Sequence, residues 1–271
     1  MDLPEIESCL RPKTREDLPF PRRDTRFVAG GTWLYSEAQP GVRHLVDLHS
    51  LGWPDLERSE AGVTLGATCT LSRLLAEAWP AAWPACAAFE AATRALSASY
   101  KVTHAATVGG NLCLALPIGT LAPLMVLLNA TYTVWRPDGT TVSWPARGFQ
   151  TGKRTTRLKQ GDLLRSIRLE AESLYAPVHF RAVGYGGYGP PVALAASTRL
   201  ASGNIRLVIA ASVAAPILLE WETVPTGKAP LVAALDRAIP DDLWIEDPLS
   251  PAVYRRARSR QLAEEVMQPW R

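Results

Sequence analysis

Two pairs of adjacent glycines are the residues of this chain whose type and spacing most clearly indicate chemistry. One pair lies in Ala29-Gly30-Gly31-Thr32 and the other in Thr107-Val108-Gly109-Gly110-Asn111. Adjacent glycines permit backbone angles that are closed to other residues, and they leave no Cβ in the way of a ligand. Successive main-chain N–H groups in such loops can form a nest for an anion such as a pyrophosphate, and the threonine and asparagine side chains would add hydrogen bonds. Each pair alone is more often only a tight turn, but the two together favour a phosphate-binding site.

Outside these pairs, the residues that most often carry chemistry are scattered. The cysteines and histidines form no CxxC pair and no group with metal-ligand spacing; they are Cys9, Cys69, Cys86, Cys113, His44, His49, His104 and His179. This argues against an iron–sulfur cluster or structural zinc within the chain, and no nucleophile–base pair can be identified. Cys113 follows the second glycine pair, but a lone thiol without a cationic neighbour is more often a small buried apolar group than a redox centre.

A third glycine-rich segment, residues 184–189, has the spacing G-x-G-x-x-G of a dinucleotide-binding turn. That turn requires a helix that begins at the third glycine and a carboxylate about 20 residues further on. Here Pro190 and Pro191 follow, and the next residues, VALAASTRL, favour a strand. We therefore expect a loop rather than a Rossmann site.

The composition is that of a globular protein with more than one compact unit. The chain has 271 residues, of which 47% are apolar and 20% charged, and a net charge of +3, which is too small to indicate nucleic acid. No stretch approaches the roughly 20 apolar residues of a membrane helix. The first residues do not resemble a secretory signal, so we expect a cytoplasmic protein. The densest basic run, Arg255, Arg256, Arg258 and Arg260, is interpreted as a solvated helix face, with a role in gripping another subunit as the alternative.

The elements that must position the glycine pairs change in character along the chain. Up to about residue 170 strands and helices alternate, with strands expected at 26–29, 44–48, 62–68 and 163–169, a hairpin at 131–135 and 140–144, and helices at 71–79, 83–98 and 120–130. A further helix is expected to open at Trp33, whereas residues 104–113 interrupt the helical pattern. Beyond residue 170, strands at 178–183, 192–200 and 205–213 precede helices at 231–239 and 252–266, which indicates an α+β unit.

Several segments together resemble the FAD-binding (medium) subunit of the molybdenum hydroxylases, the group of the carbon monoxide dehydrogenase medium subunit and the xanthine dehydrogenase FAD domain. They are FVAGGTWL, LGATCTLSRL, ATVGGNLCLALPIGTLAPL, GDLLRSIRL and DPLSPAVYRRARSRQLAEEV. The resemblance implies an α+β protein: two α/β FAD-binding subdomains of the PCMH type, followed by a C-terminal α+β domain with an antiparallel sheet and helices. The implied boundaries are residues 1–50, 51–170 and 171–271.

The resemblance also implies which residues hold the cofactor. These are Phe27, Val28, Ala29, Gly30, Gly31, Thr32, Trp33 and Leu34 in the first motif, Ala106, Thr107, Val108, Gly109, Gly110 and Asn111 in the second, and Thr120, Leu164 and Arg181 further along. Arg181 would interact with the polar edge of the flavin. Tyr185 or Tyr188 would either cover the flavin ring or lie in a surface turn.

Three departures from the family pattern concern the binding site. Thr120 stands where a carboxylate usually binds ribose hydroxyls, and Thr103-His104 replaces an Arg-Asn pair before the second motif. The segment after Arg181 lacks the usual basic residues and acid. These changes affect the expected affinity and flavin tuning more than the identity of the cofactor.

The implied function is that of an electron-transfer flavoprotein, an oxidoreductase subunit in the xanthine dehydrogenase family. The chain would take electrons from [2Fe-2S] clusters on a small iron–sulfur subunit and pass them to an external acceptor, while a large molybdenum-cofactor subunit oxidises the substrate. The complex would be a heterotrimer that forms a dimer. Two alternatives remain: a self-contained FAD-dependent oxidase, and a structural subunit that has lost FAD.

Overall fold

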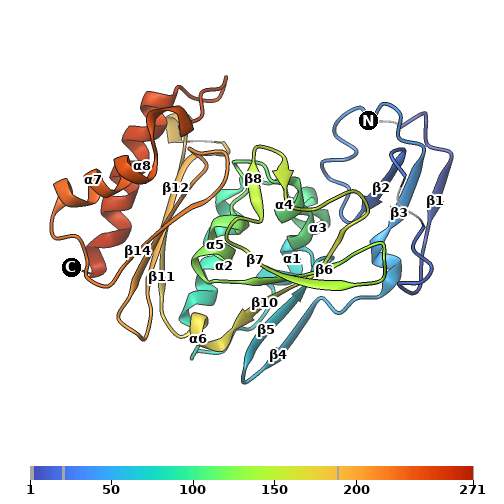
Figure 1. The fold of residues 1–271 in the computed structure, drawn as a ribbon, viewed down its shortest axis with the longest axis horizontal. Coiled ribbons are helices and arrows are strands. Elements are labelled where there is room, and N and C mark those ends of the chain that lie inside the picture. The colour runs from blue at the N-terminus through green and yellow to red at the C-terminus, as the bar shows by residue number, and fades with distance from the viewer. Residues whose placement is uncertain (1–2, 20–21, 188, 271) are drawn as a thin grey trace.

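The chain folds into three main sheets that follow one another in sequence (Figure 1). The computed structural model describes residues 3–19, 22–187 and 189–270. The first sheet is parallel, with strand order β1 (Ser8–Leu10), β3 (His44–Asp47) and β2 (Thr25–Val28). Its buried cluster is small and consists of Val28, Val42 and Leu45, with Ile6 and Leu34 packed against it.

The second sheet is antiparallel and forms the centre of the molecule. Its strand order is β4 (Leu56–Ser59), β5 (Gly62–Gly66), β10 (Leu163–Glu170), β6 (Thr131–Trp135) and β7 (Thr141–Pro145). The helices of this part are α1 (Leu71–Leu75), α2 (Ala87–Ala95), α3 (Tyr100–Ala105), α4 (Val108–Leu114), α5 (Leu121–Leu127) and α6 (Ala171–Leu174). A short hairpin, β8 (Gln150–Gly152) and β9 (Thr155–Thr156), completes it. The short helices η1 (Leu48–Leu51) and η2 (Pro84–Cys86) lie in connections.

The third sheet is buried on both faces. Its antiparallel strands are β11 (Val178–Gly184), β12 (Pro191–Arg199), β13 (Ile205–Ala210) and β14 (Ile217–Trp221), in that order. Leu194 and Ala196 join the central core with α2 and α5, whereas Ala193 and Ala195 join the core beneath α7 (Lys228–Ala238) and α8 (Ala252–Met267). Alternate residues of β12 therefore serve different cores, which explains its continuous apolar sequence. The short helices η3 (Tyr185–Gly187), η4 (Asp241–Leu243) and η5 (Gln268–Trp270) belong to this half. Figure 1 shows α7 and α8 at the end of the molecule opposite the first sheet.

The mixed α and β class expected from the sequence is confirmed, and most expected strands and helices are present. Two local predictions are wrong. Trp33 lies in a turn and opens no helix. Residues 104–113, expected to interrupt the helical pattern, lie mostly in helices: 104–105 end α3 and 108–113 belong to α4. The predicted cap of α1 is present: Thr70 Oγ1 accepts a hydrogen bond from the Arg73 N–H at 3.1 Å.

The basic run on α8 is not a uniformly solvated face. Arg255 is 1% exposed, and its guanidinium donates to Asp247 Oδ1 at 2.6 Å and to the carbonyl oxygens of Val192 and Ala211 at 3.1 and 2.7 Å. It joins α8 to β12 and to the end of β13. A buried guanidinium needs such partners because removing its charge from water is costly. The interpretation as a solvated face was therefore wrong for Arg255.

Candidate functional site

A cavity of about 580 Å³ lies where the turn after β2 faces α3, α4 and the hairpin β8–β9. Its size is in the usual range for cofactor sites. Twelve of the residues expected to bind the cofactor line it: Phe27, Val28, Ala29, Gly30, Gly31, Thr32, Trp33, Leu34, Ala106, Thr107, Gly110 and Asn111. The structure thus brings the two glycine motifs together around one cavity, although they are more than 70 residues apart in sequence.

The first glycine pair makes a sharp turn that comes very close to α3. A Cβ built on Gly30 would lie 1.8 Å from the Ala105 carbonyl oxygen, and Gly31 has the left-handed angle φ +65°. Glycine at position 30 avoids a clash with main-chain atoms, and glycine at position 31 adopts the left-handed angle without the strain of a Cβ. In the described residues, the N–H groups of Gly30, Gly31 and Thr32 find no acceptor. Three successive donors without an acceptor, on residues that line a cavity, fit the anion nest that the sequence predicted at this pair, and the binding of a phosphate there stays a prediction.

The second glycine pair has another role, and the nest predicted there was wrong. Its N–H groups are used within the protein: Val108 N donates to Cys69 O at 2.8 Å, Gly109 N to Ala67 O at 2.9 Å, and Gly110 N to Thr107 Oγ1 at 3.0 Å. A Cβ on Gly109 would lie 2.6 Å from the Ala67 carbonyl oxygen. Glycine is therefore needed for the close packing of α4 on the end of β5, which turns Gly110 and Asn111 toward the cavity.

Three buried polar atoms lie on or just behind the cavity wall without a hydrogen-bond partner in the described residues. They are Trp33 Nε1, Asn111 Oδ1 and Thr120 Oγ1. A Cβ on Gly119 would lie 3.5 Å from Asn111 Oδ1, which places the start of α5 beside that amide. Unpaired buried polar groups are uncommon in folded proteins and often mark the place of a ligand or an ordered water. A cofactor with several hydrogen-bonding groups therefore fits this cavity.

The charge of the cavity is positive. Arg26 and Arg154 are the cationic residues among those that line it, and no carboxylate or histidine does so within the described chain. Arg26 Nη1 donates to the carbonyl oxygens of Arg23 and Thr25 at 2.8 and 2.9 Å. Burial raises the pKa of the Cys113 thiol, which also lines the cavity, to about 12. Cys113 is thus a neutral thiol near pH 7, as the sequence favoured.

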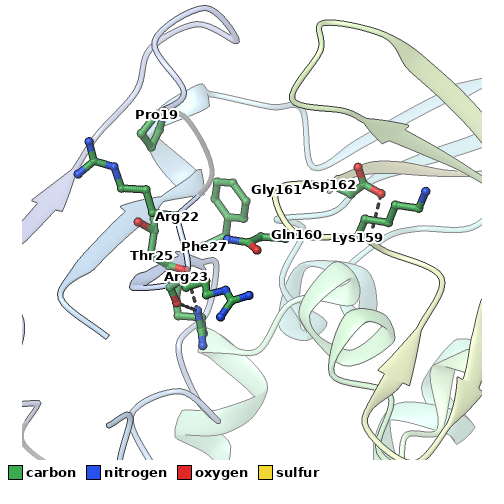
Figure 2. A pocket seen from close by; sticks show the side chains of 10 residues that line it. Pro19, Arg22, Arg23, Thr25, Phe27, Lys159, Gln160, Gly161 and Asp162 are labelled. Carbon is green, nitrogen blue, oxygen red and sulfur yellow. Dashed lines mark hydrogen bonds between the residues drawn. The ribbon is translucent and has the colours of Figure 1, made fainter. Parts of the chain in front are cut away.

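A second cavity, of about 500 Å³, adjoins the first and shares Arg26 and Phe27 with it. Figure 2 shows the Phe27 ring at its centre, facing Gln160 of the loop before β10. Arg22 and Lys159 are cationic, but their side chains point away from the Phe27 ring in opposite directions (Figure 2). Arg23, Arg26 and the carboxylate of Asp162 also line this space, which is a neighbouring cleft of mixed charge.

Five expected cofactor residues are not among those lining the first cavity. Val108 and Gly109 lie behind its wall, and Thr120 and Leu164 are buried at 0% and 3% exposure. Arg181 lies on β11 and donates from Nη1 to the Phe180 carbonyl oxygen at 3.0 Å. Their contact with the cofactor stays a prediction.

The described residues of the glycine- and tyrosine-rich segment lie close to residues that neighbour the cavity lining. No Rossmann helix follows: β12 begins at Pro191. Ser97 Oγ donates to the Gly189 carbonyl oxygen at 2.9 Å, and its neighbours Leu96 and Ala98 line the cavity. The Tyr185 ring packs edge-on against Tyr254 at 5.1 Å. Tyr188, the other tyrosine proposed to cover a flavin, lies outside the described residues.

Several lining residues escaped the sequence reasoning. Gln39, Leu96, Ala98, Val102, Leu114, Leu116, Ile118 and Arg154 all face the cavity. Most are ordinary apolar residues with no signal of their own. Arg154 had none either, because the hairpin β8–β9 that carries it was not predicted.

Two features of the described residues bear on other classes of protein. No group of three or more His, Cys, Asp or Glu side chains in this part of the chain could hold a metal ion. No helix among those described has the length and apolar character needed to cross a bilayer.

Three N–H groups without an acceptor, two arginines and unpaired polar atoms around one cavity are features that suit a phosphate-bearing organic cofactor. Residues 8–169 match the family described as the FAD binding domain in molybdopterin dehydrogenase. The match covers more than half of the 271 residues, and the chain belongs to this family. The cofactor of its domain is FAD, and the chain is a flavoprotein of the molybdenum hydroxylase group of oxidoreductases.

Comparison with individual proteins agrees with this assignment. Xanthine dehydrogenase from Oryza sativa subsp. japonica is 30% identical over 137 residues, which are 47% of this chain and only 9% of that protein. Carbon monoxide dehydrogenase from Oligotropha carboxidovorans, in reconstituted form, aligns with a TM-score of 0.83 at 24% identity, over 99% of this chain and 98% of that chain. Quinoline 2-oxidoreductase from Pseudomonas putida 86 aligns with a TM-score of 0.79 at 19% identity and the same coverage. At these identities the structural likeness shows the fold, and it extends over nearly the whole chain.

Proposed function

We propose that this chain is the FAD-carrying electron-transfer subunit of a multi-subunit molybdenum hydroxylase. The observation that carries the proposal is the turn of Gly30, Gly31 and Thr32, three residues that line the cavity and whose N–H groups have no acceptor among the described residues. Such a nest suits the pyrophosphate of FAD. When bound, FAD would accept electrons and release them to a second acceptor, which is chemistry that the protein residues themselves do not supply.

The residues of the chain would bind and orient the cofactor. The nest would hold the pyrophosphate, and Trp33 Nε1 and Asn111 Oδ1 would gain partners from the polar groups of the cofactor. The apolar residues Leu96, Ala98 and Val102 would exclude water from one end of the cavity. Thr120, Leu164 and Arg181 do not line the cavity, and we propose that they too contact the cofactor.

The cavity argues against a self-contained oxidase. An enzyme that oxidises a substrate at the flavin commonly needs a base to take a proton from it. No carboxylate or histidine from the described residues lines the cavity. Electron transfer to and from FAD requires no such group, so the relay remains the better explanation.

A chain that only transfers electrons through FAD requires partner subunits that oxidise the substrate and deliver the electrons. We propose that a small subunit with [2Fe-2S] clusters delivers electrons and that a large subunit with the molybdenum cofactor oxidises the substrate, in a cytoplasmic dimer of heterotrimers. The three sheets would correspond to units at residues 1–50, 51–170 and 171–271, with FAD extended between the first two. The presence of the first two units within the matched region, 8–169, supports this division.

The first test is the visible spectrum of the purified full chain, with heat-released cofactor identified by chromatography. We expect about one FAD per chain, in accordance with a single nest. Absence of bound flavin, even after incubation with excess FAD, would contradict the role for the isolated chain. Purification of the tagged chain from its own cells, followed by iron and molybdenum analysis, tests the partners: neither metal in the eluate would refute the proposed assembly.

A further inference from the structure

We propose that Arg154, on the hairpin β8–β9, is the cation that pairs with the cofactor phosphates, and that Glu37 forms an ion pair with it until the cofactor binds. This inference rests on the proposed function and names a residue of the same site that no motif indicated. Pyrophosphate brings negative charge into a partly buried cavity, where main-chain donors alone leave that charge uncompensated.

The position of Arg154 places it at the nest. Its guanidinium carbon lies 5.6 Å from the centre of the Trp33 ring, and Trp33 directly follows the three free N–H groups. The contact fixes a planar cation against an aromatic face, a geometry in which arginine is favoured. The Trp33 ring itself lines the cavity and has an unpaired Nε1.

The main chain of the hairpin is fixed to α4. Arg154 N donates to the Ala115 carbonyl oxygen at 2.8 Å, and Gln150 Nε2 donates to the Leu112 carbonyl oxygen at 2.9 Å. Both acceptors belong to the end of α4, where helix carbonyls have no partner within the helix. Arg154 has the left-handed angle φ +57°, which residues other than glycine seldom adopt unless the surroundings impose it. The hairpin tip is therefore held in one place, and its side chain is directed to the cavity.

The present partner of Arg154 is exchangeable. Arg154 Nη1 lies 3.3 Å from Glu37 Oε2, and the two side chains are 50% and 41% exposed. An ion pair with this exposure contributes little stability, so a phosphate can replace the carboxylate at small cost. Arg26, the other cation among the described lining residues, is engaged with two carbonyl oxygens at the outer end of the cavity.

The experiment compares variants of the full chain, stripped of flavin and titrated with FAD. Arg154→Gln is expected to raise the Kd for FAD about 10- to 100-fold, the loss of one charge-assisted interaction. Arg154→Lys should recover part of this affinity. Glu37→Gln should lower the Kd because it removes the competing carboxylate. ADP, which carries the phosphates without the flavin, should compete with FAD in the wild type and lose its affinity in parallel in Arg154→Gln.

The matched control is Arg157→Gln, which removes the same charge three residues away. Arg157 lies over the Trp144 ring at 5.1 Å, outside the cavity lining, and its loss should leave the Kd within about twofold. Equal Kd values for wild type, Arg154→Gln and Glu37→Gln would overturn the inference while leaving the proposed function intact. A wild-type chain that binds no FAD would instead overturn the proposed function. If Arg154→Gln does not fold, Arg154→Lys and Glu37→Gln decide the question.

Discussion

Replacement of Gly30 by alanine tests whether the turn after β2 is the cofactor cradle. The new Cβ would lie 1.8 Å from the Ala105 carbonyl oxygen and 2.6 Å from its carbon, and both atoms belong to main chain. A carbon and a carbonyl oxygen normally approach no closer than about 3.3 Å, so the turn and α3 must separate by roughly 1.5 Å. The nitrogen–oxygen distances of hydrogen bonds vary by only about 0.5 Å, so after this shift the N–H groups of the nest would no longer reach the phosphates.

The magnitude follows from the donors that are lost. A hydrogen bond to a charged group contributes about 1.5–3 kcal/mol, so loss of two of the three weakens binding by about 3–6 kcal/mol. This corresponds to a rise in the Kd for FAD of about 10² to 10⁴. Titration of the flavin-free variant with FAD, followed by flavin fluorescence, measures the change. Circular dichroism and the Tm of the flavin-free protein establish that the variant is folded.

Two other glycines provide the comparison. Gly152→Ala is the matched control because a Cβ there has its nearest neighbours at 3.9 Å and its φ is not left-handed. Gly31→Ala should be intermediate: its Cβ would meet only the movable Tyr35 ring, at 2.4 Å, but alanine at φ +65° costs about 1–2 kcal/mol. A folded Gly30→Ala variant that binds FAD within about threefold of the wild type would refute the cradle.

Three further predictions concern other parts of the molecule. The pKa of the Cys113 thiol is raised to about 12, so Cys113 should react with iodoacetamide at pH 8 about 10³-fold more slowly than a free thiol. Bound FAD should slow the reaction further. Mass spectrometry measures the rate of alkylation, and a rate like that of a free thiol would contradict this. Hydrogen bonds from Arg260 lower the pKa of Asp236 below 3.8, so its ionised form stabilises the fold above that pH, and this stabilisation disappears as the pH falls through the folded-state pKa. Asp236→Asn should therefore reduce the free energy of unfolding by about 0.5–1 kcal/mol at pH 7, and by progressively less below pH 3.8. Urea unfolding measures this loss. An equal loss at pH 3 and pH 7 would refute a stabilising role for the ionised form of Asp236. Arg255→Met should cost about 3–5 kcal/mol because Asp247 and several carbonyl oxygens lose their partner, and a urea midpoint unchanged from the wild type would show the buried pair to be dispensable.

The fold was predictable where local sequence and tertiary structure agree. The hairpin β6–β7 follows from alternating residues around Pro137-Asp138-Gly139, and α1 follows from the cap at Thr70. The α4 helix was missed because two adjacent glycines disfavour a helix, and the stabilising bonds come from Ala67 and Cys69, some 40 residues earlier.

The site was predictable only in part, for a related reason. The turn at Gly30 and Gly31 carries its chemistry in its own sequence, since the residue type determines the backbone that the nest requires. Arg154 acquires its place through Trp33 and Ala115, contacts that no local pattern encodes. For Arg255 the local sequence is misleading. The basic residues around it are typical of an exposed helix face, but Arg255 is buried and its charge is paired with Asp247.

The small apolar cluster of the first sheet has a consequence for how this protein matures. The cluster of Val28, Val42 and Leu45, even with the buried Val46 and Leu48 added, is small beside the loss of chain entropy on ordering about 50 residues. FAD that touches both the turn after β2 and α4 would join this sheet to the larger cores, and at 100 times its Kd it adds about 2.7 kcal/mol against their separation. Amide hydrogens of β2 and β3 should then exchange about 100-fold more slowly in the flavin-loaded chain, while those of β12 keep their rate. Binding of FAD would thereby complete the folding of the N-terminal part. In a chain without flavin, this part would unfold locally more often, which would expose it to proteases and weaken its contacts with partner subunits.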